Sequence, residues 1–242
     1  MVMIDGAAPR VRARVAGVVY LLYFLTAVVG ELFVQAAGVS GLQVNPVFDR
    51  TTATTVFAHQ GVFELGFFLG IVSIALYVAL MGFFYELFRP VSRTLTLIAV
   101  LFTIVGQAVA AAGSILDLAP LVFLNGSSYL TTFTPTQLQS LAALFLNLSA
   151  QTGPITLVFA GLFQIAIGYV MYRSTFLPRV LGGLVALAGV GWLTFMSPPL
   201  ANAVGSYVEI LGFVAEAALM LWLIIKGVND DRWNARAAEA KA

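Results

Sequence analysis

Six long runs of apolar residues, separated by proline, glycine, asparagine and charged residues, dominate this chain. Of its 242 residues, 60% are hydrophobic and only 10% are charged. A soluble domain carries about 25% charged residues, so a chain this poor in charge cannot cover a water-facing surface. Runs of roughly 20 apolar residues match the thickness of a bilayer, and lipid is therefore the expected solvent.

We predict an all-α fold, a polytopic membrane bundle of six transmembrane helices. Backbone groups in hydrocarbon must pair within their own segment, whereas a barrel would show alternating segments of about 10 residues. The first run is longer than the apolar part of a signal peptide, and we interpret it as a retained span. The predicted spans cover residues 15–38, 56–88 (with a start shortly after Asp49 as an alternative), 94–118, 151–172, 178–196 and 206–226.

A further apolar stretch precedes the fourth span. It opens with Thr134-Pro135-Thr136-Gln137, which is typical of a helix start with Thr134 as N-cap and Pro135 at the first helical position. The stretch is too short to cross a bilayer by itself. Residues 134–150 therefore form either an extra interfacial helix or the outer end of a long fourth span, kinked near Gly153-Pro154.

The basic residues predict the orientation of the bundle. All but one of the 12 arginines and lysines fall on one side of a six-span topology, and Arg50 alone falls on the other. The positive-inside rule makes the basic side cytoplasmic, so both termini are expected there. We expect a basic cytoplasmic segment at 1–14, a membrane domain at 15–228 and a polar cytoplasmic tail at 229–242, in a multi-pass protein of a bacterial plasma (inner) membrane.

Composition excludes several kinds of chemistry. The chain has no cysteine, so it holds no disulfide, thiolate nucleophile or iron–sulfur cluster. His59 is the single histidine, and it lies five residues before Glu64, so the two side chains would point about 140° apart on a helix. We predict no cofactor and no metal site, with His59 as the one residue that a metal could share with carboxylates of other helices. The net charge of +1 argues against nucleic acid as a partner, and the lipid bilayer is the expected one.

Acidic side chains inside the spans are the main clue to function, because a charge at a helix centre costs about 2.5–3.5 kcal/mol on insertion scales. In the six-span topology all of them lie near the midplane or in the outer half. Gln60 and Glu64 share one helix face, and Gln107 and Asp117 share another. We expect these faces to meet around a polar cavity open to the outside. The candidate ligand-binding residues are Glu31, Gln60, Glu64, Gln107, Asp117, Glu209 and Glu216.

The acidic residues could instead have a purely structural role. Asp117 and Glu209 are close enough to span ends to be solvated, and the deeper glutamates could be protonated and hydrogen-bonded between helices. Aromatic residues in the spans are interpreted as packing and interfacial residues. These are Tyr20, Tyr23, Trp192 and Trp222.

Several short stretches, taken together, resemble a known family. They are residues 16–22 with 31–34, residues 88–93, residues 172–174 with 177–182, and Glu216 with 221–223 and 226–228. Over residues 14–228 the chain is similar to the bacterial membrane proteins grouped as domain of unknown function 4386 (DUF4386). The resemblance implies the fold and class and no activity. Members often carry a histidine near the position of Ser149, where this chain has serine.

The positions that the resemblance singles out are Glu31, Arg89, Arg93, Arg173, Arg179 and Glu216. The arginines have an alternative role as topology determinants near anionic headgroups.

Three functions remain open from the sequence. The favoured one is binding or transport of a proton, a cation or a small amphipathic ligand at the outward-facing pocket. The second is a non-catalytic scaffold or regulatory protein, in which the acids are tied up between helices. The third is an intramembrane enzyme that modifies a lipid with paired carboxylates. We favour a protein that is not an enzyme, and the sequence leaves its ligand and oligomeric state open.

Overall fold

The computed structural model describes residues 8–39 and 46–240, which are helical and contain no strand. Six helical segments in these ranges are long and apolar enough to cross a membrane, which confirms the predicted all-α, six-span fold. The helices are α1 (Pro9–Ala36), α2 (Arg50–Ala58), α3 (Gln60–Phe88), α4 (Arg93–Asp117), α5 (Ala119–Phe123), α6 (Pro135–Ala150), α7 (Thr152–Arg173), α8 (Arg179–Trp192), α9 (Pro198–Ile225) and α10 (Asp230–Glu239). Two short 3-10 turns, η1 (Ser128–Leu130) and η2 (Leu193–Met196), complete the set.

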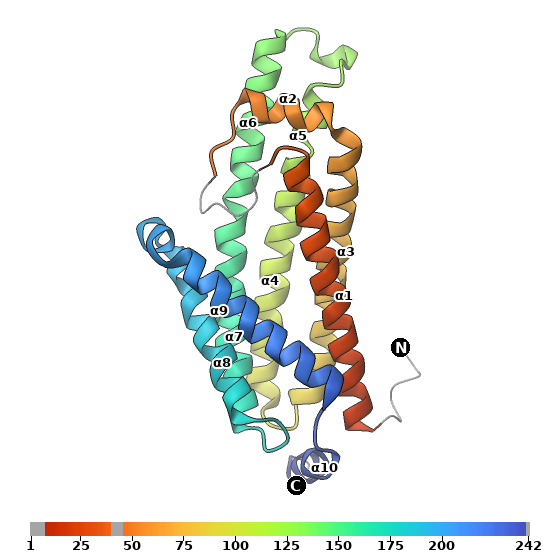
Figure 1. The fold of residues 1–242 in the computed structure, drawn as a ribbon, viewed down its shortest axis with the longest axis vertical. Coiled ribbons are helices and arrows are strands. Elements are labelled where there is room, and N and C mark those ends of the chain that lie inside the picture. Colours follow the sequence, from red (N-terminus) through yellow and green to blue (C-terminus); the bar gives the residue numbers. More distant parts are fainter. Residues whose placement is uncertain (1–7, 40–45, 241–242) are drawn as a thin grey trace.

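The helix start predicted at residue 134 is present and complete. Thr134 accepts a hydrogen bond from the backbone of Gln137, and the Gln137 side chain accepts one from the backbone of Thr134. The two orphan N–H groups are thereby satisfied reciprocally, as in a capping box. α6 then runs on in line with α7 (Figure 1), and the two form one apolar segment over Pro135–Arg173. The stretch thus continues into the fourth predicted span, as in the second of the two alternatives, and its depth relative to the membrane surface stays a prediction.

The interruption in this long segment lies at Gln151, two residues before Gly153 and so near the predicted Gly153-Pro154 kink. Pro154 falls in the first turn of α7, where its missing N–H removes no helical hydrogen bond. Proline is therefore tolerated here.

A separate helix precedes the second span. Asp49 caps α2 by accepting a 2.8 Å hydrogen bond from the backbone N–H of Thr52. α2 lies across the end of the bundle remote from both termini (Figure 1), and His59 joins it to α3. The second span thus begins at Gln60, later than the predicted residue 56, because the chain turns at His59.

The bundle is held by close helix pairs. A Cβ added to Gly66 of α3 would come within 2.8 Å of the Gly30 carbonyl oxygen on α1, so only glycine permits this approach. The pair α7 and α8 packs equally tightly through Gly168 and Gly182. α9 crosses obliquely over the bundle (Figure 1) and packs on α8 and α1.

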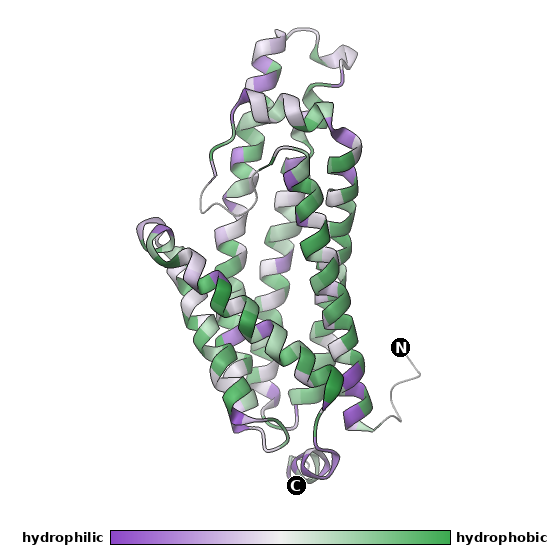
Figure 2. Cartoon of the chain, in the orientation of Figure 1, coloured by the Kyte–Doolittle hydropathy of each residue, from purple (hydrophilic) through white to green (hydrophobic). Residues whose placement is uncertain are grey.

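Hydrophilic residues concentrate at the two ends of the molecule, and the length between them is largely apolar (Figure 2). At the end that carries both termini, α10 is tied to the bundle. The Trp233 indole donates a 2.8 Å hydrogen bond to the Leu87 carbonyl oxygen, and the backbone N–H of Arg10 donates one of 2.7 Å to Asp230. This distribution matches a helical bundle whose ends lie at the two membrane surfaces.

Candidate functional site

A cavity of about 490 Å³ lies between α1, α3, α4, α7 and α9, toward the end of the bundle remote from the termini. Three acidic residues from three helices line it: Glu31 of α1, Asp117 of α4 and Glu209 of α9. The described lining contains no basic side chain, and most of the remainder is apolar or glycine. The cavity therefore combines carboxyl groups with an apolar wall, within the size range of small-ligand sites.

Two of the carboxyl groups are close to each other. Asp117 and Glu31 lie near enough to interact electrostatically, and the Ser149 side chain lies beside the Asp117 carboxyl. Glu31 also accepts a 3.2 Å hydrogen bond from the amide of Gln35, one turn along α1. Both acids thus have neighbours that orient them, with the cavity on their open side.

Aromatic rings form part of the apolar wall. Phe63 and Phe67 of α3, Phe195 of η2 and Phe48 from the segment before α2 all line the cavity. The Phe48 backbone is bound by Asn147 of α6. The Asn147 side chain donates a 2.7 Å hydrogen bond to the Phe48 carbonyl oxygen and accepts one of 2.9 Å from the Phe48 N–H. Asn147 therefore positions the segment that borders the cavity.

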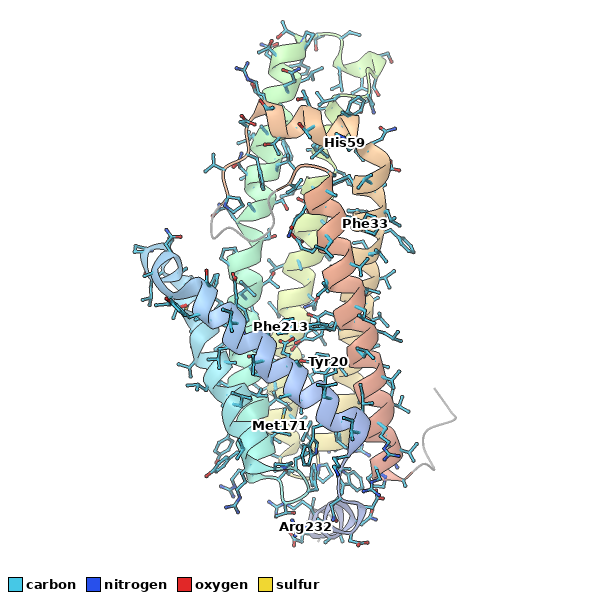
Figure 3. All side chains as sticks on the ribbon, viewed as in Figure 1. Tyr20, Phe33, His59, Met171, Phe213 and Arg232 are labelled. Atoms are coloured by element: carbon cyan, nitrogen blue, oxygen red, sulfur yellow. The ribbon has the colours of Figure 1, made fainter. Side chains whose placement is uncertain are left out.

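The other predicted ligand-binding residues lie elsewhere. Gln60 and Glu64 are exposed on the outside of α3, and His59 is exposed at the α2–α3 junction (Figure 3). Gln107 is half-buried and does not line the cavity. The expected meeting of polar helix faces therefore occurs only in part, and the binding role of every residue in the set stays a prediction.

Glu216 lies deeper, in a separate polar cluster. Gln164 of α7, which is 2% exposed, donates a 2.8 Å hydrogen bond to the Glu216 carboxyl. The Tyr20 hydroxyl approaches the same carboxyl closely enough to donate to it, and Tyr23 and Tyr77 stand beside it with ring centroids 4.5 Å apart. This cluster ties α9 to α1 and α7.

The cluster lies just beyond the floor of the cavity. Ala27 and Ser73 line the cavity, and Tyr23 and Tyr77 follow one helical turn further toward the termini on α1 and α3. Figure 3 places Tyr20 near the crossing of α9 over α1. The described residues thus include an acidic cavity and, one helical turn closer to the termini, the half-buried carboxyl group of Glu216.

Gln164 and Tyr77 were not among the residues singled out from the sequence, Ser149 was noted only as a family position, and Tyr20 and Tyr23 were interpreted as packing aromatics. The tyrosines do pack in the core, and they also surround the Glu216 carboxyl. Gln164 is a polar residue at the middle of a span, and the cost of burying an amide in hydrocarbon was the available signal.

Within residues 8–39 and 46–240, no three histidine or acidic side chains converge as metal ligands. The fold and the site together define a multi-pass α-helical membrane protein with an acidic cavity between its helices.

Comparison of the sequence with known protein families identifies the family of this chain. The family described as domain of unknown function (DUF4386) matches residues 15–227, and the chain belongs to it. An uncharacterized protein of Archaeoglobus fulgidus is 27% identical over 185 residues, which cover 75% of this chain and 90% of that relative. No solved structure matches the chain.

Proposed function

We propose that this protein binds a small amphipathic cation in the cavity bordered by Glu31, Asp117 and Glu209. One observation supports this most directly: carboxyl groups from three helices share one cavity whose described lining has no basic residue. Carboxyl groups gathered in this way repel one another when ionised, and a bound cation offsets the repulsion. The phenylalanine rings of the wall favour an organic cation, because ring faces attract positive charge.

The distribution of arginines indicates how the molecule is oriented in the membrane. The end that carries Arg89, Arg93, Arg173 and Arg179 faces the cytoplasm under the positive-inside rule, so the cavity lies toward the outer surface. A cation would then enter from outside the cell. Binding alone, or binding as one step of transport, is consistent with this geometry.

The experiment is thermal unfolding of the purified chain with increasing benzyltrimethylammonium. A ligand that binds only the folded state raises the unfolding midpoint. We expect this rise in the wild type, and a loss of roughly tenfold in affinity in Glu31→Gln and in Asp117→Asn, equivalent to about 1.4 kcal/mol.

Glu64→Gln is the matched control. Glu64 is a glutamate near the same end of the bundle, and it is exposed outside the cavity. The control should bind as the wild type does. Equal stabilisation of all four proteins would mean non-specific binding and would remove the proposal. No stabilisation of any of them would favour a scaffold in which the acids serve only helix packing.

A further inference from the structure

A second cavity, of about 1000 Å³, lies at the end of the bundle that carries the termini. The start of α1, the turn from α3 to α4, and α10 enclose it. It is separate from the acidic cavity and has the opposite charge. Three arginines line it, Arg12, Arg89 and Arg93, against one acid, Glu86.

Each arginine comes from a different segment and is placed by local structure. The Arg12 guanidinium lies over the Trp233 ring of α10, 5.9 Å from its centroid. Arg89 follows the last residue of α3 and pairs with Glu86 at 2.9 Å. Arg93 is the first residue of α4, is exposed, and its side chain makes no hydrogen bond or ion pair within the described ranges. Among the described lining residues, three guanidinium groups stand against one carboxylate, so the lining carries a net positive charge.

The N-terminus of α4 adds to the positive electrostatic potential of the cavity. Ser92 caps the helix, and both Ser92 and Arg93 line the cavity. The first turn of a long helix carries positive partial charge and N–H groups without helical partners, which favours anions. Guanidinium groups and a helix N-terminus together form a setting that suits a phosphate group, since arginine binds phosphate oxygens through a planar fork of N–H donors.

The position of the cavity along the helices indicates which molecule would supply a phosphate group to it. Its arginines lie at the ends of α1, α3 and α4, three helices that are long and apolar enough to cross the membrane. Helix ends of this kind lie at the level of the lipid headgroups. We propose that the cavity formed by Arg12, Arg89, Arg93 and α10 binds the phosphate of an anionic phospholipid headgroup.

α10 completes the site and explains why it is a cavity rather than an open patch. Trp233, Asn234 and Ala237 of α10 form one side of the lining. α10 is fixed there by the Trp233 bond to Leu87 and by a 3.1 Å hydrogen bond from Arg232 to the Thr175 carbonyl oxygen. The headgroup would therefore lie between the bundle and its C-terminal helix.

The test uses the full chain in lipid nanodiscs of phosphatidylcholine with increasing phosphatidylglycerol, followed by native mass spectrometry of retained lipid. The variant is Arg89→Gln combined with Arg93→Gln. The control is Arg173→Gln combined with Arg179→Gln, which removes the same charge at the same end from residues outside the cavity. Equal unfolding midpoints in pure phosphatidylcholine show that both variants fold.

We expect phosphatidylglycerol retention to weaken by roughly tenfold or more in the Arg89/Arg93 variant, because each arginine supplies a charge-assisted hydrogen bond. The Arg173/Arg179 variant should stay close to wild type. Equal losses in both variants would mean diffuse attraction to a charged surface and would overturn the site, as would full retention in both.

A second arm separates lipid from soluble phosphate. The same proteins in neutral detergent are titrated with inorganic phosphate, and their unfolding midpoints are followed. No shift in the wild type supports the lipid as ligand. A shift that the Arg89/Arg93 variant lacks supports the phosphate site but assigns it to a soluble anion, and so overturns the lipid source.

Discussion

Gln164 of α7 donates a hydrogen bond of 2.8 Å from its Nε2 to Oε1 of Glu216 on α9. It is a side-chain link between two spans, in a region otherwise packed by aromatic and aliphatic residues. The other amide atom of Gln164, Oε1, is buried without a partner among the described residues. The link therefore joins α9 to the bundle while leaving one buried oxygen for a water molecule or a proton donor.

Removing one partner of this link should destabilise the bundle. Glu216→Leu leaves the buried Gln164 amide unpaired, and we expect a loss of about 1 kcal/mol, the usual scale for interhelical hydrogen bonds in membranes. The double variant Gln164→Leu with Glu216→Leu should lose less than the sum of the single losses. Reversible unfolding in mixed micelles measures the cycle, and strict additivity would show that the pair is not coupled.

Close packing of α7 on α8 should make one glycine irreplaceable. A Cβ at Gly168 would lie 2.6 Å from the Ala186 backbone nitrogen and 2.8 Å from the Gly182 carbonyl oxygen, and backbone cannot yield as a side chain can. We expect Gly168→Ala to lower stability by about 1–3 kcal/mol. Gly183→Ala is the control, since its added methyl meets nothing within 4 Å, and it should be neutral or slightly stabilising. Equal behaviour of the two variants would contradict this packing.

The Asn147 clamp should hold the segment before α2 in place. Asn147→Ala removes both hydrogen bonds to the Phe48 backbone, and the exposed Ser140→Ala on the same helix serves as the control. We expect faster hydrogen exchange at the Phe48 N–H and in α2 for Asn147→Ala, and little change for the control. Unchanged exchange in Asn147→Ala would show that other contacts suffice.

The Asp49 cap should make α2 sensitive to acid. Hydrogen bonds from the Thr52 backbone N–H and hydroxyl lower the pKa of Asp49 below its usual value. Because the folded pKa is depressed, the cap's contribution is complete above the unfolded pKa of about 3.9 and is lost as pH falls through the folded value. We expect Asp49→Asn to remove this pH dependence while keeping a cap, and Asp49→Ala to remove both. Hydrogen exchange of the α2 amides across pH is the measurement.

The absence of cysteine permits a direct test of orientation. Ser140→Cys of α6 and Ala238→Cys of α10 place single thiols on exposed positions toward opposite ends of the bundle. If the basic end is cytoplasmic, a membrane-impermeant maleimide added to intact cells labels Ser140→Cys and leaves Ala238→Cys unlabelled until lysis. The reverse pattern would invert the proposed topology and place the acidic cavity on the cytoplasmic side.

The sequence by itself determined the class of fold, the number of spans and several of their ends. Residues in lipid must satisfy their backbone locally, so a long apolar run has one structural outcome. The cap at Thr134 could also be predicted from the sequence, because a capping box depends only on residues three positions apart. The basic clusters that line the second cavity were equally visible as residue types.

Only the tertiary structure decided which polar residues meet. Glu64 and Glu216 both lie within spans, yet the first is exposed outside the bundle and the second is half-buried beside residues of three other helices. In a soluble helix the apolar stripe reveals the buried face, but lipid tails are as apolar as a protein core. Hydropathy therefore carries no sign of how each helix is rotated, and that rotation depends on close contacts such as Gly30 with Gly66 and Gly168 with Gly182.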